Sequence, residues 1–198
     1  MPRFRPLGAL EVSARLVAVP FLMYLLQVAL PAPWGLLGIL PRTETGLVGV
    51  LFAPLLHANL AHLVSNATPL FVLLLLLFSD SRYRPEPTLA AIWLASGMGT
   101  WLIGRGDAVH IGASGIVFGL VTYLIVSGLM MRSWRAASVA LVVLFLFGGV
   151  FLGALPQPGP ISWEGHLCGA AAGVWSARYT HGRSRGWSRR REPLSWSR

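Results

Sequence analysis

The chain contains no lysine and only one cysteine, and charged residues make up only 12% of its 198 positions. All sixteen basic residues are arginine, and only seven residues are acidic. The single thiol, Cys168, excludes an intramolecular disulfide and provides no cysteine metal site. We interpret Cys168 as a small packing residue, and the sequence predicts no metal and no cofactor.

Hydrophobic residues, by contrast, make up 55% of the chain, and its mean hydropathy is +0.63. This composition is too apolar for an ordinary soluble domain and is typical of an integral membrane protein. A net charge of +9 could attract nucleic acid, but no recognition motif or folded basic domain accompanies it. Arginines in loops beside membrane helices explain the charge more simply, so we expect no nucleic-acid partner.

Six apolar runs approach the length of about 20 residues that a helix needs to cross a membrane core of about 30 Å. The predicted spans cover residues 15–30, 57–78, 88–103, 112–131, 136–154 and 163–179. The fold class is therefore all-α, a polytopic membrane protein with a six-transmembrane-helix bundle. Its parts are an N-terminal segment (1–14), the membrane domain (15–180) and a basic, disordered tail (181–198). The first run weakly resembles a cleaved signal peptide, but we favour a retained helix.

The arginines predict the orientation of this bundle. If the N-terminus is cytoplasmic, fourteen arginines flank the inner ends of the spans, and only Arg42 and Arg105 lie outside. The positive-inside rule then places both termini in the cytoplasm. The second, fourth and sixth spans consequently all begin at the outer face, so their first turns share one depth.

Two further segments have predicted membrane contacts. The mostly apolar loop 31–56 is expected to be partly embedded in the membrane. The tail has arginines interleaved with tryptophans, which suits a surface of anionic lipids, although it could serve only as a topology anchor.

Polar residues occur in those three first turns. Ser114 begins the fourth span and His166 lies near the start of the sixth, and buried polar groups in a membrane are candidate functional residues. Both spans carry glycines four residues apart, which allow close helix approach: Gly115 and Gly119, and Gly169 and Gly173. If these faces pack together, Ser114 and His166 form a nucleophile and its base. The alternative is a packing motif in which Ser114 bonds to its own helix.

His62 and Asn66 are four residues apart, so they share one helix face. With the Ser114 backbone N–H they could stabilise an oxyanion, although they could also simply pin helices together. Phe118, four residues after Ser114, could stack on His166. Glu164 is two residues from His166 and points elsewhere, so the site is predicted to be a Ser–His dyad rather than a triad.

Two other histidines receive lesser roles. His57 is expected to project away from His62 and brace the preceding loop. His110 is interpreted as a loop residue with polar partners rather than a catalytic group.

Three motifs resemble those of the rhomboid intramembrane serine proteases. Residues 57–66 resemble H-x4-H-x3-N, Gly112-Ala113-Ser114-Gly115 resembles G-x-S-G, and residues 166–173 resemble H-x2-G-x3-G. Each motif is weak alone, but together, in this order and on alternate spans, they are specific. The resemblance covers the chain from about residue 15 to about residue 178.

The resemblance implies that Ser114 attacks the peptide carbonyl, that His166 is base and then acid, and that His62, Asn66 and the Ser114 amide hold the oxyanion. It implies membrane-anchored protein substrates that are cut near the end of a transmembrane helix. Two positions depart from the family. The Trp-Arg pair common in the first loop is missing, which leaves the packing of that loop open, and Phe118 replaces a frequent tyrosine.

The other functions considered are a rhomboid-like pseudoprotease that binds or escorts membrane proteins, and a small channel or transporter. A pseudoprotease usually lacks the serine or the histidine, and a channel needs polar residues along its whole path. We expect a multi-pass protein of the bacterial inner membrane whose active site opens to the external face.

Overall fold

The computed structural model describes residues 6–157 and 161–188, and it is all-α. The α-helices of this described part are α1 (Pro6–Ala29), α2 (Glu44–Phe52), α3 (Leu60–Phe78), α4 (Pro85–Ile103), α5 (Ser114–Met130), α6 (Trp134–Phe147) and α7 (Trp163–Ser188). Short 3-10 helices lie between them: η1 (Trp34–Leu37), η2 (Ala53–Leu55), η3 (Ser81–Tyr83) and η4 (Gly148–Ala154).

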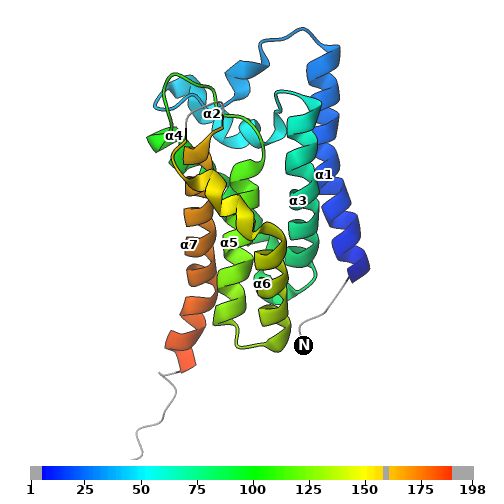
Figure 1. The fold of residues 1–198 in the computed structure, drawn as a ribbon, viewed down its shortest axis with the longest axis vertical. Helices are drawn as coiled ribbons and strands as arrows, with labels where there is room; N and C mark the ends of the chain where they lie inside the picture. The colour runs from blue at the N-terminus through cyan, green and yellow to red at the C-terminus, as the bar shows by residue number, and fades with distance from the viewer. Residues whose placement is uncertain (1–5, 158–160, 189–198) are drawn as a thin grey trace, which may run out of the picture.

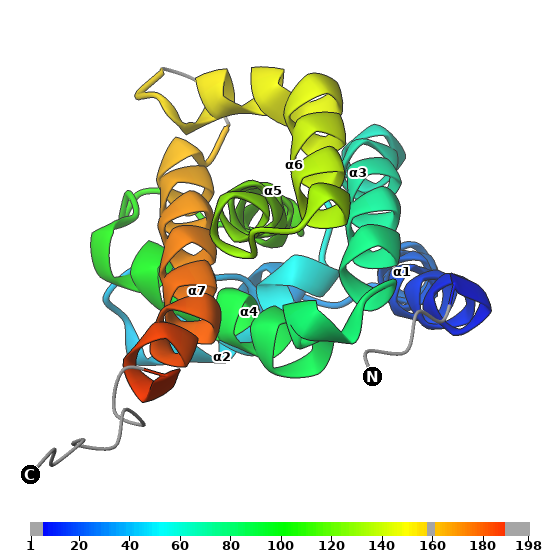
Figure 2. The same cartoon turned by 90° about the horizontal axis from the view of Figure 1, so that it is seen from below.

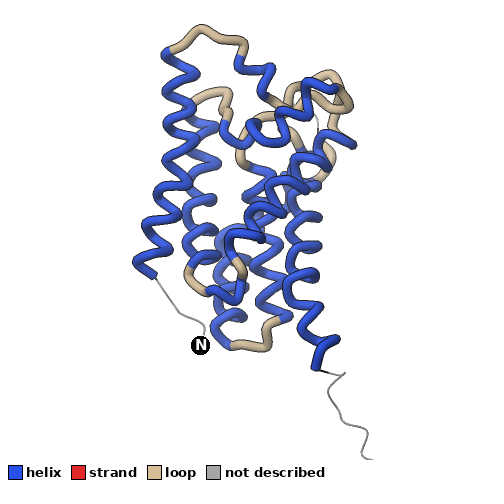
Figure 3. The backbone as a smooth tube through the Cα atoms, turned by 180° about the vertical axis from the view of Figure 1, so that it is seen from behind, coloured by secondary structure: helices blue, strands red, loops and turns tan. Residues whose placement is uncertain are grey.

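The long helices run up and down in one bundle (Figure 1). Helices α3, α5 and α7 all begin at the upper end of the view, and both described chain ends lie at the lower end. Seen from behind, α2 and the long loops gather at the upper end (Figure 3). The prediction that the three polar first turns share one level is confirmed.

Helix α5 occupies the centre of the bundle, with α3, α4, α6 and α7 around it (Figure 2). Eleven of its 17 residues are buried, among them Leu120, Tyr123 and Leu124, which are fully buried. Helix α1 packs against α3 at the outside of the bundle. The helix that begins with Ser114 is therefore held on all sides.

Glycines form the contact between α5 and α7, as predicted. A Cβ atom added to Gly169 would collide with the backbone of Gly115, and one added to Gly173 would collide with Gly119. Thr122 Oγ1 also donates a hydrogen bond to the Ala170 carbonyl across this contact, at 2.9 Å. The small residues thus bring the two backbones close together, as in other membrane helix pairs.

Within the described residues, three segments are long and apolar enough to cross a membrane: 7–29, 60–78, and 134–154, which joins α6 to η4. Two shorter helical segments, 44–55 and 114–130, are also apolar. Large apolar side chains cover the outside of the bundle, such as Phe145, which is 86% exposed. This surface suits lipid, whereas the count of six spans and the orientation of the termini remain predictions.

Several helix boundaries differ from the predicted ones. Helix α1 begins at Pro6 rather than residue 15, and α3 begins only at Leu60, because the Asn59 side chain caps it by accepting from the His62 N–H at 2.8 Å. Helix α6 gives way to η4 at Gly148-Gly149, since glycine weakens a helix interior.

The last helix extends beyond residue 179, the predicted end of the sixth span. Helix α7 continues to Ser188 because no proline interrupts it between Trp163 and that residue. Residues 181–188 are therefore helical, and the rest of the predicted tail, 189–198, lies outside the described residues.

The first loop contains α2, whose existence the sequence had not indicated. The Thr43 side chain caps α2 by accepting from the Gly46 N–H at 3.1 Å. Arg42 then fastens the loop to the end of α4, donating to the Leu102 and Gly104 carbonyls at 3.0 and 2.8 Å. Trp101 donates back to the Thr43 carbonyl at 2.8 Å. An arginine and a tryptophan thus hold this loop, although no Trp-Arg pair is present.

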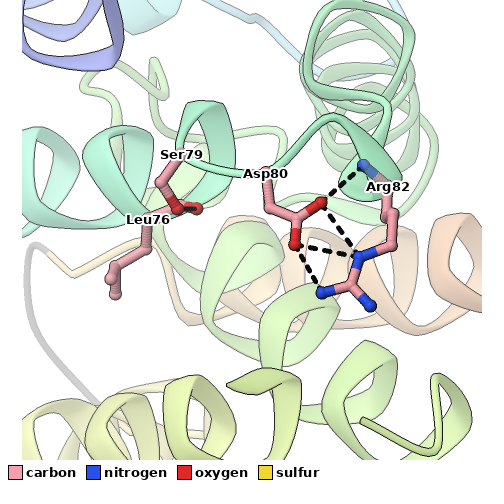
Figure 4. Close-up of polar contacts among 4 residues, drawn as sticks. All are labelled: Leu76, Ser79, Asp80 and Arg82. Carbon is pink, nitrogen blue, oxygen red and sulfur yellow. Dashed lines mark hydrogen bonds and ion pairs between the residues drawn. The ribbon is translucent and has the colours of Figure 1, made fainter. Parts of the chain in front are cut away.

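At the opposite end of the bundle, the turn between α3 and α4 contains an ion pair between Asp80 and Arg82 (Figure 4). Arg82 Nη2 lies 2.5 Å from Asp80 Oδ2, and the Arg82 backbone N–H also donates to this carboxylate. Hydrogen bonding by Arg82 lowers the pKa of Asp80, so the pair is charged at neutral pH.

Candidate active site

Ser114 and His166 meet at the upper end of the bundle. Ser114 is the first residue of α5, His166 lies in the first turn of α7, and Ser114 Oγ is 2.9 Å from His166 Nε2. This is a normal hydrogen-bond distance, and a serine hydroxyl beside an imidazole nitrogen is an arrangement that can serve as nucleophile and base. The alternative reading of the sequence, in which glycine packing alone explains Ser114, does not account for this contact.

The other ring nitrogen of His166 is held by a backbone carbonyl. His166 Nδ1 lies 2.8 Å from the oxygen of Gly153, in η4. Because a carbonyl oxygen only accepts, Nδ1 must carry the proton, and Nε2 of the neutral ring is then free to accept from the Ser114 hydroxyl. The Gly153 carbonyl thus selects the tautomer, a task that an aspartate performs in a triad.

Sequence reasoning missed Gly153. Every residue has a carbonyl, so nothing in the residue types indicates which one faces the base. The weak signal is Gly153 itself, because an added Cβ would lie only 3.3 Å from Phe118 Cζ and 3.4 Å from His166 Nδ1. A small residue is therefore favoured beside the two rings.

Phe118 stacks on His166, as predicted. The ring centroids are 4.2 Å apart and the planes differ by 10°. Phe118 is buried, so it holds the imidazole plane in one orientation. The stacked ring and the Gly153 carbonyl together orient the base without a carboxylate.

His62 and Asn66 reach the same site from α3. The His62 ring lies over Gly112, where a Cβ atom would be 2.8 Å from both Cε1 and Nε2. Asn66 Nδ2 donates to the His62 carbonyl at 2.8 Å, which occupies one of its two amide hydrogens. The second amide hydrogen remains as a possible donor toward the cavity.

One cavity of about 560 Å³ brings these groups together. Its lining includes His62, Asn66, Ser114, Phe118 and His166. Ser114 opens α5, and the first N–H groups of a helix have no acceptor within that helix. The cavity thus brings together a serine hydroxyl, an imidazole and N–H groups of the kind that can stabilise an oxyanion.

The prediction that His57 projects away from His62 is wrong, because α3 begins only at Leu60 and His57 lies in the loop before it rather than on the same helix. The His57 backbone N–H donates to Gln27 Oε1 at 3.1 Å, so the loop is tied to α1. Its buried ring meets the edge of the His62 ring, with centroids 5.1 Å apart. Burial lowers the pKa of His57 to about 4, so this ring is neutral at pH 7.

Glu164 and His110 lie beside the site without touching the dyad. Glu164 points away from His166, as predicted, and its Oε1 lies 2.8 Å from Arg105 Nε. His110 is a loop residue with polar partners, as predicted, and Nδ1 lies 2.5 Å from Ser162 Oγ. Sequence reasoning missed Arg105 and Ser162, since neither belongs to a motif.

Cys168 is buried against Gly99 and is a packing residue.

The family model of the Rhomboid domain matches residues 44–183 of the chain. The chain belongs to the rhomboid family. The match runs from the start of α2 into α7 and contains Ser114, His166, His62 and Asn66. With its apolar outer surface, the chain is a rhomboid-like membrane protein.

Several curated proteins are similar to this rhomboid. Uncharacterized proteins of Mycobacterium tuberculosis and Mycobacterium bovis are each 49% identical over 148 residues, which cover 71% of this chain and 62% of theirs. The chain therefore spans less than two thirds of these relatives. A protein of Acanthamoeba polyphaga mimivirus with a provisional rhomboid name is 28% identical over 67% of this chain and 74% of its own. No solved structure matches.

Proposed function

We propose that this rhomboid is an intramembrane serine endopeptidase that cuts membrane-anchored proteins in or near their transmembrane segments. The observation that carries the proposal is the contact of 2.9 Å between Ser114 Oγ and His166 Nε2. Two further contacts support it: the Gly153 carbonyl holds His166 in the tautomer that the reaction needs, and the stacked Phe118 ring holds the imidazole plane in one orientation.

In the first step, His166 Nε2 takes the Ser114 hydroxyl proton while Oγ attacks the scissile carbonyl carbon. The carbonyl oxygen becomes an oxyanion, which the Ser114 N–H, His62 and Asn66 stabilise by hydrogen bonds. The imidazolium then gives its proton to the leaving amine as the C–N bond breaks. Water, activated by His166 in the same way, hydrolyses the acyl-enzyme and restores Ser114.

The site lies at the end of the bundle where α3, α5 and α7 begin. With the arginine bias of the loops, we place this end at the external face of a bacterial inner membrane, with both termini in the cytoplasm. Water can reach the cavity at that depth. A substrate helix hides its carbonyls in its own hydrogen bonds, so it must unwind locally before attack. Anionic lipids are the proposed partners of the basic tail.

Ser114→Ala should abolish cleavage of a model single-span substrate by the full chain in liposomes, because it removes the nucleophile. Cleavage is measured by the appearance of product fragments. Ser79→Ala is the matched control, since the Ser79 hydroxyl lies at the opposite end of the bundle, where it donates to the Leu76 carbonyl (Figure 4). Cleavage by purified Ser114→Ala at the wild-type rate would contradict the assignment.

A fluorophosphonate probe distinguishes an enzyme from a pseudoprotease. An assembled dyad should be labelled at Ser114, and the label should disappear in Ser114→Ala and His166→Ala. A wild-type chain that folds but takes up no label would favour a binding or escort protein.

A further inference from the structure

We propose that Arg105 and His110 are positioning residues: they fix where His166 lies relative to Ser114 along the axis of the bundle. Both lie in the loop 104–113, which joins α4 to α5 and ends directly at Ser114. Their side chains contact residues at the start of α7. We call this group of five residues the α7 clamp: Arg105 and His110 on the loop, and Ile161, Ser162 and Glu164 at the start of α7. The inference rests on the proposed peptidase function.

The first part of the α7 clamp is an ion pair. Arg105 Nε lies 2.8 Å from Glu164 Oε1, and the Glu164 side chain is only 3% exposed. Arg105 Nη2 also donates to the Ile161 carbonyl at 2.8 Å. A buried carboxylate is costly unless a positive charge accompanies it. Arg105 is thus bound to both sides of the start of α7, and Glu164 lies only two residues before His166.

The second part passes through His110, which is 5% exposed. His110 Nε2 lies 3.1 Å from the Arg105 carbonyl, so it must donate, and Nδ1 then accepts from the Ser162 hydroxyl at 2.5 Å. The Ser162 carbonyl in turn accepts from the His166 N–H at 3.1 Å. Hydrogen bonds on both sides of Ser162 therefore connect the loop to the backbone of His166.

The loop is itself anchored to the first loop of the chain. His110 and Ile39 exchange two backbone hydrogen bonds of 2.9 Å, and the Gly112 N–H donates to the Ala53 carbonyl at 2.8 Å. One anchored segment therefore carries the nucleophile at its end and holds the base through its side chains. A displacement of about 1 Å between reacting groups can cost about 100-fold in rate, so this arrangement bears directly on catalysis.

The test compares Arg105→Gln with Arg82→Gln. Arg82 forms the other arginine–carboxylate pair described above, with Asp80 at the opposite end of the bundle, and its side chain is exposed to the same extent, 35% against 33%. The measurements are the rate of fluorophosphonate labelling of Ser114, kcat and KM for a model substrate, and the thermal unfolding midpoint. All use the full chain in detergent micelles.

Arg105→Gln should slow labelling and lower kcat about 10- to 100-fold while KM changes less than about twofold, because the base is displaced and the substrate contacts remain. Arg82→Gln should stay within about twofold of wild type. Labelling of Arg105→Gln at the wild-type rate, or an equal loss in both variants, would overturn the α7 clamp.

Two further variants keep the test decisive if Arg105→Gln folds poorly. Arg105→Lys retains the charge beside Glu164 but cannot reproduce the forked donors of arginine, so an intermediate labelling rate is expected. In Arg105→Gln combined with Glu164→Gln, no buried charge is left unpaired, and the labelling rate should rise above that of Arg105→Gln alone. If neither variant labels faster than Arg105→Gln, the ion pair is not the positioning element.

His110→Gln and His110→Leu test the second part. Glutamine can still donate to one partner and accept from the other, so it should label faster than leucine by about tenfold. Equal rates would exclude His110 from the α7 clamp. If the wild-type chain takes up no label, the peptidase proposal itself fails, whereas a labelled wild type with unaffected variants overturns only the α7 clamp.

Discussion

At Gly112 the backbone has a φ of +106°, which side-chain-bearing residues rarely adopt. The space above its Cα is filled by the His62 ring. One glycine therefore meets two requirements, a left-handed turn before Ser114 and the close approach of a proposed oxyanion donor. The backbone conformation and the contact with His62 together explain why the first position of the G-x-S-G pattern is glycine.

Gly112→Ala should lower the cleavage rate about 100-fold or more, because the new methyl group strains the turn and pushes His62 away from the cavity. Cleavage of the model substrate measures this effect. Gly35→Ala is the matched control, since an added Cβ at Gly35 meets nothing within 4 Å and its φ is not positive. Equal rates for the two variants would show that the contact between Gly112 and His62 does not matter for catalysis.

At the scale of elements, the site depends on how closely α5 and α7 approach. Their glycines place backbone against backbone at two successive turns, so that a short serine side chain on one helix can reach an imidazole on the other. Helix α6 contributes in a different way, because its 3-10 continuation η4 carries the carbonyl that orients the base. Five elements thus serve one hydrogen-bonded pair: α3, α5, α7, η4 and the loop 104–113.

Gly169→Ala and Gly173→Ala should each lower the free energy of unfolding by about 1–3 kcal/mol, because the added methyl groups overpack the contact with α5. Denaturant unfolding in mixed micelles measures the change. Gly182→Ala lies on the same helix, and an added Cβ there meets nothing within 4 Å. That variant should be neutral or more stable by up to about 1 kcal/mol. Destabilisation of Gly182→Ala by the same amount would show that the losses at Gly169 and Gly173 do not come from the glycine contact with α5.

At the scale of the whole molecule, the bundle separates a reactive end from an arginine-rich end. The proposed dyad, the cavity and the longest loops lie where α3, α5 and α7 begin, and the Asp80–Arg82 pair lies at the other end. If the chain crosses the membrane six times, the reactive end faces outward and both termini face inward.

Single cysteines in a Cys168→Ala background test this orientation. Gly35→Cys, at the reactive end, should react with a membrane-impermeant maleimide in intact cells, because residue 35 is exposed there. Arg132→Cys, in the exposed turn between α5 and α6, should react only after the membrane is opened. The reverse pattern would invert the topology and place the site on the inner face.

Much of this architecture could be predicted from the sequence. Apolar runs indicated the long helices, and the glycine spacing on α5 and α7 indicated their contact, because both patterns follow from local chemistry. Helix ends were less predictable. The cap at Asn59 and the change to 3-10 geometry at Gly148 depend on competing backbone hydrogen bonds, and α2 is too short for a periodic signal.

The sequence by itself determined the family, the pairing of Ser114 with His166 and the level at which they meet, because motif order, glycine spacing and charge bias are all carried by residue type. Only the tertiary structure decided which groups orient the base. The Gly153 carbonyl, the Arg105–Glu164 pair and the His110–Ser162 hydrogen bond join segments far apart in the chain. Such contacts depend on distances of about 3 Å between atoms, which no local pattern of residue types encodes.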